Sequence, residues 1–178
     1  SSTSYTVKFG DPYTLPIPTK EGYVFDGWFK GSTLIASSGT WSTEMGGTNT
    51  LTAHWSLPSY RIQYDLNGGY VNGNPNSYNI EDSITLNNPT KTGYTFVGWT
   101  GTGLSEPTLN VFFTGETGDR SYTANWSANS YTITLNPNGG TVSQTSIIVI
   151  YGSGYSLPIP TREGYKFDGW YNNTTLVQ

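Results

Sequence analysis

The sequence predicts a mainly β protein with little helix, and three observations point to that class. Of the 178 residues, 22 are Gly and 10 are Pro, two residue types that disfavour helices. Aromatic residues make up 15% of the chain and supply core volume that the 34% hydrophobic fraction would otherwise leave thin. Only 11% of the residues are charged. That fraction argues against coiled coils, helical bundles and disorder driven by charge.

Charge and composition exclude several functional classes. The chain carries 8 Lys plus Arg against 12 Asp plus Glu, so its net charge is −4 and the basic stripe of a nucleic-acid binder is missing. No apolar run approaches the roughly 20 residues that cross a bilayer, so we expect no membrane span in this chain. Cysteine is absent, which excludes disulfides, thiolate metal ligands and cysteine nucleophiles. That absence fits both a cytosolic protein and an exported bacterial protein.

A fixed period runs through the chain. Trp28, Trp99 and Trp170 are equally spaced in the sequence, and the match needs no gap. The same step relates Gly22, Gly93 and Gly164; Pro18, Pro89 and Pro160; Trp55 and Trp126; and Tyr60 and Tyr131. Chance does not keep so many Trp, Gly and Pro positions in phase, so the chain is a tandem repeat.

The period predicts three modules, at residues 1–56, 60–127 and 131–178. On this alignment the first module lacks an opening strand and the third lacks a closing strand. We expect either an excerpt of a longer array or modules that complete one another between chains. The junctions at residues 57–59 and 128–130 are short, which predicts a semi-rigid array.

Each module is expected to contain three strands in a fixed order. An opening strand such as residues 60–66 alternates apolar and polar side chains and ends at an Asn-Gly-Gly hairpin signal. A Pro-to-Gly turn then leads into an aromatic strand, residues 23–28, in which Gly27 is a candidate bulge or a point of close approach that lets the indole turn inward. A closing strand, residues 50–55, ends the module. The recurring aromatic residues are the predicted core: Tyr23, Phe25, Trp28, Trp55, Tyr94, Phe96, Trp99, Trp126, Tyr165, Phe167 and Trp170.

This order of motifs resembles the internalin B repeat, also called the Listeria–Bacteroides repeat. The residues that carry the resemblance are an opening Tyr-x-Ile/Val, Asn-Gly-Gly, Pro-Thr-Lys/Arg-x-Gly-Tyr-x-Phe-x-Gly-Trp and a closing Ala-x-Trp, over nearly the whole chain. The resemblance implies β-grasp-like modules, each one repeat period of about 71 residues long, in tandem in proteins at the bacterial cell surface or cell wall. Such repeats are regarded as spacers or interaction modules. Residues 100–118 match residues 29–47 poorly, where a β-grasp needs a short helix or an irregular crossover.

The sequence offers little material for catalysis. His54 is the single histidine, and the equivalent position in the next module holds Asn125. Asp26 and Asp168 recur, but Val97 stands between them, which favours a turn or surface role over paired acid–base chemistry. No nucleophile elbow, phosphate loop or metal-spaced histidine cluster is present. We therefore predict no enzyme, no catalytic residue, no cofactor and no metal.

Aromatic residues outside the period are the candidates for ligand binding, because packing of the shared fold does not demand them. These are Trp41, Tyr70, Phe112 and Phe113, and filling of the local core is the other role open to them. A basic residue recurs before the Gly-Tyr turn at Lys20, Lys91 and Arg162, as a solvated turn residue or as a partner in a Lys–Asn isopeptide bond.

The function that follows is a semi-rigid stalk or spacer of an exported bacterial surface protein. The expected partners are the neighbouring repeats, further copies in a head-to-tail filament, and a host or cell-surface protein or glycan bound in adhesion. The alternative is a carbohydrate-binding module, which would need a row of exposed aromatic side chains.

Overall fold

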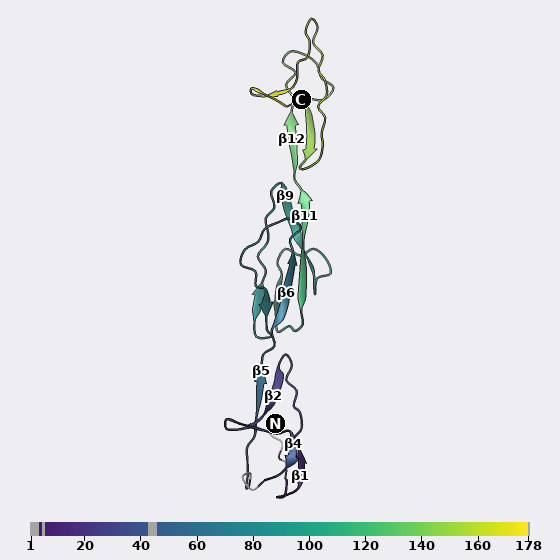
Figure 1. Cartoon of the computed structure of the whole chain (residues 1–178). Coiled ribbons are helices and arrows are strands. Elements are labelled where there is room, and N and C mark those ends of the chain that lie inside the picture. Colours follow the sequence, from purple (N-terminus) through teal and green to yellow (C-terminus); the bar gives the residue numbers. More distant parts are fainter. Residues whose placement is uncertain (1–3, 5, 43–45, 178) are drawn as a thin grey trace. The chain divides into compact units, whose positions relative to one another are not determined.

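A computed structural model of the chain describes residues 4, 6–42 and 46–177, and over these ranges it contains strands and turns but no helix (Figure 1). The mainly β prediction is confirmed, whereas the β-grasp form of each module stays a prediction. The strands are β1 (Pro12–Thr14), β2 (Val24–Lys30), β3 (Thr33–Ile35), β4 (Ser38–Thr40), β5 (Thr52–Ser56), β6 (Tyr60–Asp65), β7 (Ser77–Tyr78), β8 (Ser83–Thr85), β9 (Tyr94–Gly101), β10 (Phe112–Thr114), β11 (Arg120–Ala128), β12 (Ser130–Thr134), β13 (Ser146–Ile150), β14 (Tyr171–Asn172) and β15 (Thr175–Leu176).

The chain divides into two compact units. The first consists of Ser1–Gln63, Pro75–Thr85 and Phe112–Arg120, and the second of Tyr64–Asn74, Leu86–Val111 and Ser121–Gln178. The division runs through the middle repeat, since β6 and β11 each carry residues of both units. The module boundaries at 1–56, 60–127 and 131–178 remain a prediction.

In the first unit, β2 is the central strand of a sheet ordered β3-β2-β5. Phe25 lies opposite Trp55 and Trp28 opposite Ala53, with a bulge between Phe25 and Gly27. Gly27 has a φ of 140°, which L side chains rarely adopt, so the predicted bulge at this glycine is confirmed. A smaller pair, β1 with β4, places Tyr13 in a buried position.

The middle repeat contains a sheet ordered β7-β6-β11-β9. Trp99 of β9 is 0% exposed, and its ring packs among Tyr64, Phe96 and Tyr122 at centroid distances of 5.8, 5.5 and 6.4 Å. Burial raises the pKa of the Tyr64 phenol to about 12, with the neighbouring Tyr122 phenol adding to the shift. Interlocked aromatic rings therefore replace the aliphatic residues that the composition lacks.

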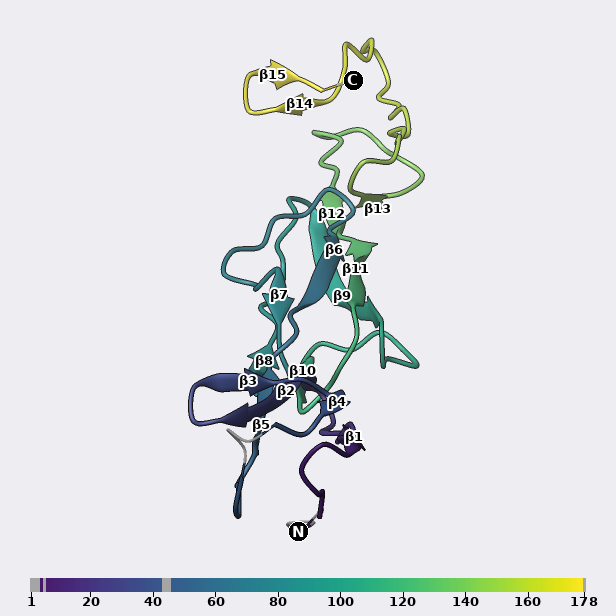
Figure 2. The ribbon, with the colours of Figure 1, turned by 60° about the horizontal axis from the view of Figure 1, so that its bottom comes forward.

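The third repeat opens with the hairpin of β12 and β13 and ends with the short pair β14 and β15, which Figure 2 shows in yellow. Leu135, Leu157 and Trp170 form its buried core, and Phe167 packs against that cluster. Residues 165–170 have the same Gly-Tyr-x-Phe-x-Gly-Trp context as β2 and β9 but are not in a strand. The same motif is therefore in a strand in β2 and β9 and outside a strand at residues 165–170.

Candidate functional site

The Gly-Tyr turn is built in the same way in every repeat, with a basic side chain lying over the tyrosine ring. Lys20 Nζ lies 3.3 Å from the centroid of Tyr23, Lys91 Nζ 4.2 Å from Tyr94, and the Arg162 guanidinium carbon 3.9 Å from Tyr165. Each contact is a cation–π interaction, with a typical strength of about 0.5–1 kcal/mol at an exposed site. The recurring basic residue thus stabilises the turn and is more than a solvated charge.

Two of these basic residues, Lys91 and Arg162, also hold the Asn-Gly-Gly hairpins. Lys91 Nζ donates to the backbone oxygen of Asn67 at 2.8 Å, and Arg162 donates to the backbone oxygen of Asn138 at 2.9 Å. Asn67 and Asn138 both have positive φ, 47° and 50°, as a tight reversal requires. Lys91 and Asn67 are therefore joined by a hydrogen bond to a backbone carbonyl and not by an isopeptide bond between their side chains. The Asn67 side-chain amide donates to Ala124 O at 2.9 Å.

In the first unit, the Gly-Tyr turn at residues 22–23 contacts residues 80–81 of the following repeat. We call such a turn, together with the residues that it contacts in the following repeat, a corner. Gly22 has a φ of 75°, and a Cβ at this position would overlap the side chain of Ile80. The neighbouring Tyr23 hydroxyl donates to the carboxylate of Glu81. That hydrogen bond, with the negative charge of Glu81, raises the pKa of Tyr23 above its ordinary value of 10.0. Glycine is required at residue 22 both by the backbone and by the approach of Ile80.

An equivalent corner recurs in the second unit. Gly93 has a φ of 78°, and a Cβ there would overlap the ring of Tyr151. Tyr151 lies edge-on to Tyr94, with ring centroids 5.6 Å apart. Ile80 and Tyr151 are one repeat period apart, as are Gly22 and Gly93, so one junction geometry is used twice. The recurring glycine therefore serves a contact between repeats.

The second corner is reinforced by Asn129, the one residue between β11 and β12. Its N–H donates to Gly93 O at 2.9 Å, and its own carbonyl accepts from Tyr151 N at 2.9 Å. Its side-chain oxygen accepts from Thr95 Oγ1 at 2.7 Å. The equivalent residue at the first junction is Pro58, which has no N–H to donate. These repeat junctions, residues 22–23 with 80–81 and residues 93–95 with 129 and 151, are the candidate functional site.

The sequence-predicted ligand candidates occupy different environments. Phe112 and Phe113 are neighbours in β10, so their side chains point to opposite faces of the strand. Phe112 is 61% exposed and Phe113 is 7% exposed. Phe113 is thus a core residue and its ring is not available to a ligand, which corrects that candidate. Trp41 is half-buried with its ring edge-on to Tyr13 at 5.2 Å, and Tyr70 is 68% exposed.

The predicted core residues are buried to different degrees. Trp99 and Trp170 are buried, and most of the others are half-buried: Tyr23, Phe25, Trp28, Trp55, Tyr94, Phe96, Trp126 and Phe167. Tyr165 is 67% exposed, so its assignment to the core is corrected. Tyr94 at the equivalent position is covered by Tyr151 as well as by Lys91, whereas the Tyr165 ring contacts Arg162.

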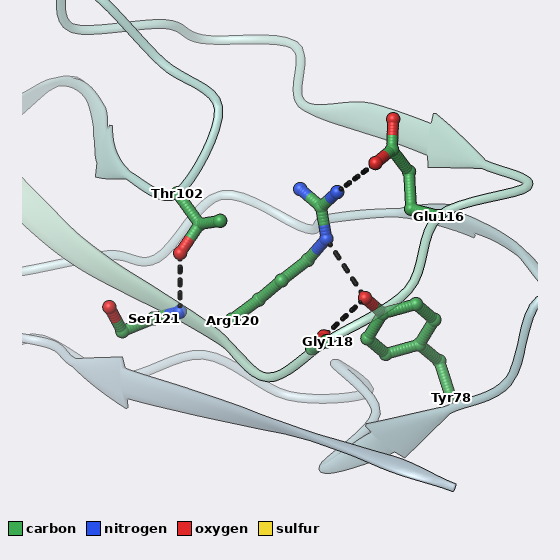
Figure 3. A network of polar contacts seen from close by, with 6 residues as sticks. All are labelled: Tyr78, Thr102, Glu116, Gly118, Arg120 and Ser121. Atoms are coloured by element: carbon green, nitrogen blue, oxygen red, sulfur yellow. Dashed lines mark hydrogen bonds and ion pairs between the residues drawn. The ribbon is translucent and has the colours of Figure 1, made fainter. Parts of the chain in front are cut away.

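Sequence reasoning missed Arg120, a buried charged residue of the first unit (Figure 3). Its side chain is 8% exposed and pairs with Glu116 at 2.8 Å. Its Nε donates to the Tyr78 hydroxyl at 3.1 Å, and that hydroxyl donates to Gly118 O at 2.6 Å. The guanidinium also lies 4.3 Å from the centroid of Phe113. No sequence signal identified it, because the equivalent residue of the first repeat is Asn49.

Potential catalytic groups are engaged in ordinary contacts. His54 is exposed and its ring stacks on Phe29 at 4.0 Å, while Asp26 accepts a hydrogen bond from Ser56 Oγ at 2.8 Å. Within the described ranges, no group of three or more His, Cys, Asp or Glu residues is arranged to hold a metal ion. Among the same residues, no helix is long and apolar enough to span a membrane.

Comparison of the sequence with known proteins identifies its family. The sequence profile of the Listeria-Bacteroides repeat domain matches residues 1–54, 60–110 and 131–178, which is most of the chain. The chain belongs to the Listeria-Bacteroides repeat family. The three matched segments contain the Gly-Tyr turns at Gly22, Gly93 and Gly164, so each Listeria-Bacteroides repeat of this chain has this turn.

The relatives that match this chain are much longer proteins. A protein of Evansella cellulosilytica named as a Gly-rich membrane protein is 28% identical over 180 residues, covering 96% of this chain and 20% of the relative. Internalin H of Listeria monocytogenes is 37% identical over 99 residues, covering 54% of this chain and 18% of the relative. The chain thus spans about a fifth of the length of these relatives. No solved structure matches it significantly.

Proposed function

We propose that the chain is a non-enzymatic structural and interaction module that acts as a semi-rigid stalk or spacer. The observation that carries the proposal is the contact between Gly93 and the ring of Tyr151, with Asn129 hydrogen-bonded to both sides of the junction. A flexible string of domains needs no such contact, since a linker that is free to bend makes few bonds with the modules it joins. The equivalent contact between Gly22 and Ile80 supports the same role at the first junction.

We further propose that the module belongs to an exported protein displayed at a bacterial surface or cell wall. Support comes from the relatives, one named as a membrane protein and one as an internalin. A stalk in that setting presents neighbouring domains to a host protein, to another cell or to a glycan. Adhesion and head-to-tail assembly are parts of this proposal that the junction geometry leaves open to experiment.

The carbohydrate-binding alternative receives less support. A glycan platform needs several exposed aromatic faces side by side, and the neighbouring pair Phe112 and Phe113 is split by strand alternation into one exposed and one buried ring. Tyr70 is the other strongly exposed candidate, at 68%. Titration with a panel of glycans separates the two functions, because a stalk without a glycan site gives no saturable binding.

Spin-label distances across the second junction test the stalk directly. The chain has no native cysteine, so labels attach only to introduced ones, at Val97→Cys and Ile148→Cys, two exposed strand positions in the second unit. We expect a narrow distance distribution. A matched variant with four Gly-Ser residues inserted after Asn129 should broaden it. Equal widths in the two proteins would reject a semi-rigid junction.

A further inference from the structure

Strand β13 of the third repeat is apolar, uncharged and exposed at the edge of its sheet. Among the described residues it pairs with β12 alone. With the residue that follows it, β13 reads SIIVIY, a run of high β propensity without charge, Pro or Gly. Ile148 is 74% exposed and Ile150 is 51% exposed. Exposed edge strands of this composition readily pair with a further strand.

The backbone of β13 has a row of hydrogen-bonding groups that point away from β12. Tyr151, directly after the strand, donates its N–H to Asn129 O at 2.9 Å and therefore faces the β12 side. Hydrogen-bonded positions alternate in an antiparallel pair, so the odd-numbered residues of β13 face β12. Ser146, Ile148 and Ile150 consequently direct their N–H and C=O groups to the outer edge.

The edge position of this strand belongs to the fold of the repeat. The middle repeat has a closing strand, β11, and its sheet is ordered β7-β6-β11-β9. Strand β7 is the equivalent of β13, since Ser77 and Ile148 are one repeat period apart. It lies at the end of that order, and β11 lies on the other side of β6. A closing strand therefore leaves this edge open.

The middle repeat protects this edge in two ways. Strand β7 is only 2 residues long, whereas β13 has 5 residues. Asn79, the equivalent of Ile150, donates its outward N–H to the Asp82 carboxylate at 2.8 Å, and Glu81 adds a second negative charge beside it. Short edge strands and charged side chains are common protections against pairing with another chain. In the third repeat, the positions of Glu81 and Asp82 hold Gly152 and Ser153.

The turn after this strand is the same in all three repeats, so only its side chains differ. Its N–H donates three residues back, from Asp11 to Lys8 O at 3.1 Å, from Asp82 to Asn79 O at 3.1 Å, and from Ser153 to Ile150 O at 3.0 Å. The first repeat thus has a Lys and an Asp here, and the second has an Asp. The third repeat has neither charge.

We propose that β13 is a homotypic pairing edge, which binds β13 of a second copy of this chain in the antiparallel direction. The register follows from the outward row of three residues. All three pair only when a twofold axis passes beside Ile148, so that Ile148 lies opposite Ile148 of the second copy and Ser146 lies opposite Ile150. The exposed isoleucines of both copies then lie together on one face of a continuous sheet.

A second copy is the occupant because the edge is complementary to itself. A twofold antiparallel pair places each outward N–H opposite a C=O of the other copy. The chain has a net charge of −4, so copies repel one another, and an uncharged edge lowers the electrostatic cost of contact. The contact is isologous and closes at two chains, which separates it from head-to-tail assembly.

The dimer should be weak and reversible. One pair of short strands buries much less than the roughly 1,200–2,000 Å² of a stable interface. We therefore expect a monomer–dimer equilibrium with a dissociation constant of about 0.1–1 mM, which sedimentation equilibrium of the 178-residue chain up to about 1 mM resolves. A chain that stays monomeric over this range would overturn the proposal, as would oligomers that grow beyond dimers.

Ile148→Lys tests the place of the contact. Two lysines would face each other across the axis, so dimerisation should weaken by about tenfold or more. Ser77→Lys is the matched control, because it adds the same charge at the equivalent exposed position of β7. We expect it to leave dimerisation unchanged. An equal loss in the two variants would mean that net charge and not this edge governs association, and would overturn the proposal.

Ser153→Asp separates edge pairing from packing of the isoleucine side chains. It copies Asp82, whose carboxylate accepts from Asn79 N, and it leaves Ile148 and Ile150 in place. We expect dimerisation to weaken by about threefold or more, because the Ile150 N–H is occupied and two carboxylates approach each other. Unchanged dimerisation in this variant would show that the isoleucine faces stack without strand pairing, and would overturn the assignment to the edge.

Disulfide trapping tests the register in a chain that has no native cysteine. Ser146→Cys and Ile150→Cys lie opposite each other in the proposed pair, at a Cα separation of about 5.5 Å that a disulfide spans. Copies of one residue lie four positions apart along the strands, about 13 Å, which is too far. A mixture of the two variants should crosslink about tenfold more than either alone. Equal crosslinking of the mixture and the single variants would contradict the pairing.

Discussion

The ring of Tyr151 occupies the space where any side chain on Gly93 would lie. Gly93 is held at a φ of 78° and its carbonyl accepts from Asn129 N, whose own carbonyl accepts from Tyr151 N. One glycine thus combines a strained turn with a contact to the next repeat. Gly22 has the same relation to Ile80, so the contact tolerates an aliphatic or an aromatic side chain.

Gly93→Ala should weaken the second junction more than its backbone strain alone predicts. Forcing a side chain into positive φ costs about 1–3 kcal/mol, and the clash with Tyr151 adds to that cost. Gly164→Ala is the matched control, since Gly164 has a φ of 76° and no described atom within 4 Å of its Cβ position. Hydrogen exchange at the Asn129 and Tyr151 amides measures the junction. Equal acceleration in both variants would contradict a packing role for Gly93.

Trp99→Ala should destabilise the second unit by about 3–5 kcal/mol, because it truncates a large side chain that is 0% exposed. Domains typically have only about 5–15 kcal/mol of stability, so the loss is severe. Urea denaturation followed by tyrosine and tryptophan fluorescence measures it. An unchanged midpoint would mean that Trp99 does not stabilise the core.

Alkaline pH should destabilise the second unit through Tyr64. Its folded pKa of about 12 lies above the ordinary value of 10.0, so the protonated phenol is favoured in the folded state. The contribution to stability is therefore complete below about pH 10 and is lost as the pH rises towards 12. Tyr64→Phe removes the titrating group, and its free energy of unfolding should fall less over this window. Parallel pH profiles for the two proteins would argue against the shifted pKa.

Arg120→Ala should lower the free energy of unfolding far more than Glu116→Gln, although the two residues form one ion pair. Glu116 is 52% exposed, so losing its charge should cost about 1 kcal/mol or less. Arg120 is buried against Phe113 and bonds Tyr78, so its truncation also removes packing and a hydrogen bond, at about 2 kcal/mol or more. Chemical denaturation of both variants makes the comparison. If both variants lost the same free energy of unfolding, the ion pair alone would account for the contribution of Arg120.

Local patterns predicted much of the fold. Most of the alternating residues 60–66 lie in β6 (Tyr60–Asp65), most of the closing segment at residues 50–55 lies in β5 (Thr52–Ser56), and Gly27 lies at the bulge. These features follow from side-chain alternation and from glycine's access to positive φ, which are properties of a few consecutive residues. The junction contacts and the buried Arg120 could not be predicted in this way, because their partners lie in other strands or in the next repeat.

The sequence by itself determined the β class, the repeat period and the positions that need glycine, since composition and spacing carry that information. Only the tertiary structure decided that Phe113 is buried while Phe112 is exposed, that Tyr165 lies open while Tyr94 is covered, and that residues 165–170 are not in a strand. The physical reason is that burial and strand pairing depend on contacts with residues that are distant in the sequence. Equivalent positions of the repeated motif therefore lie in different environments.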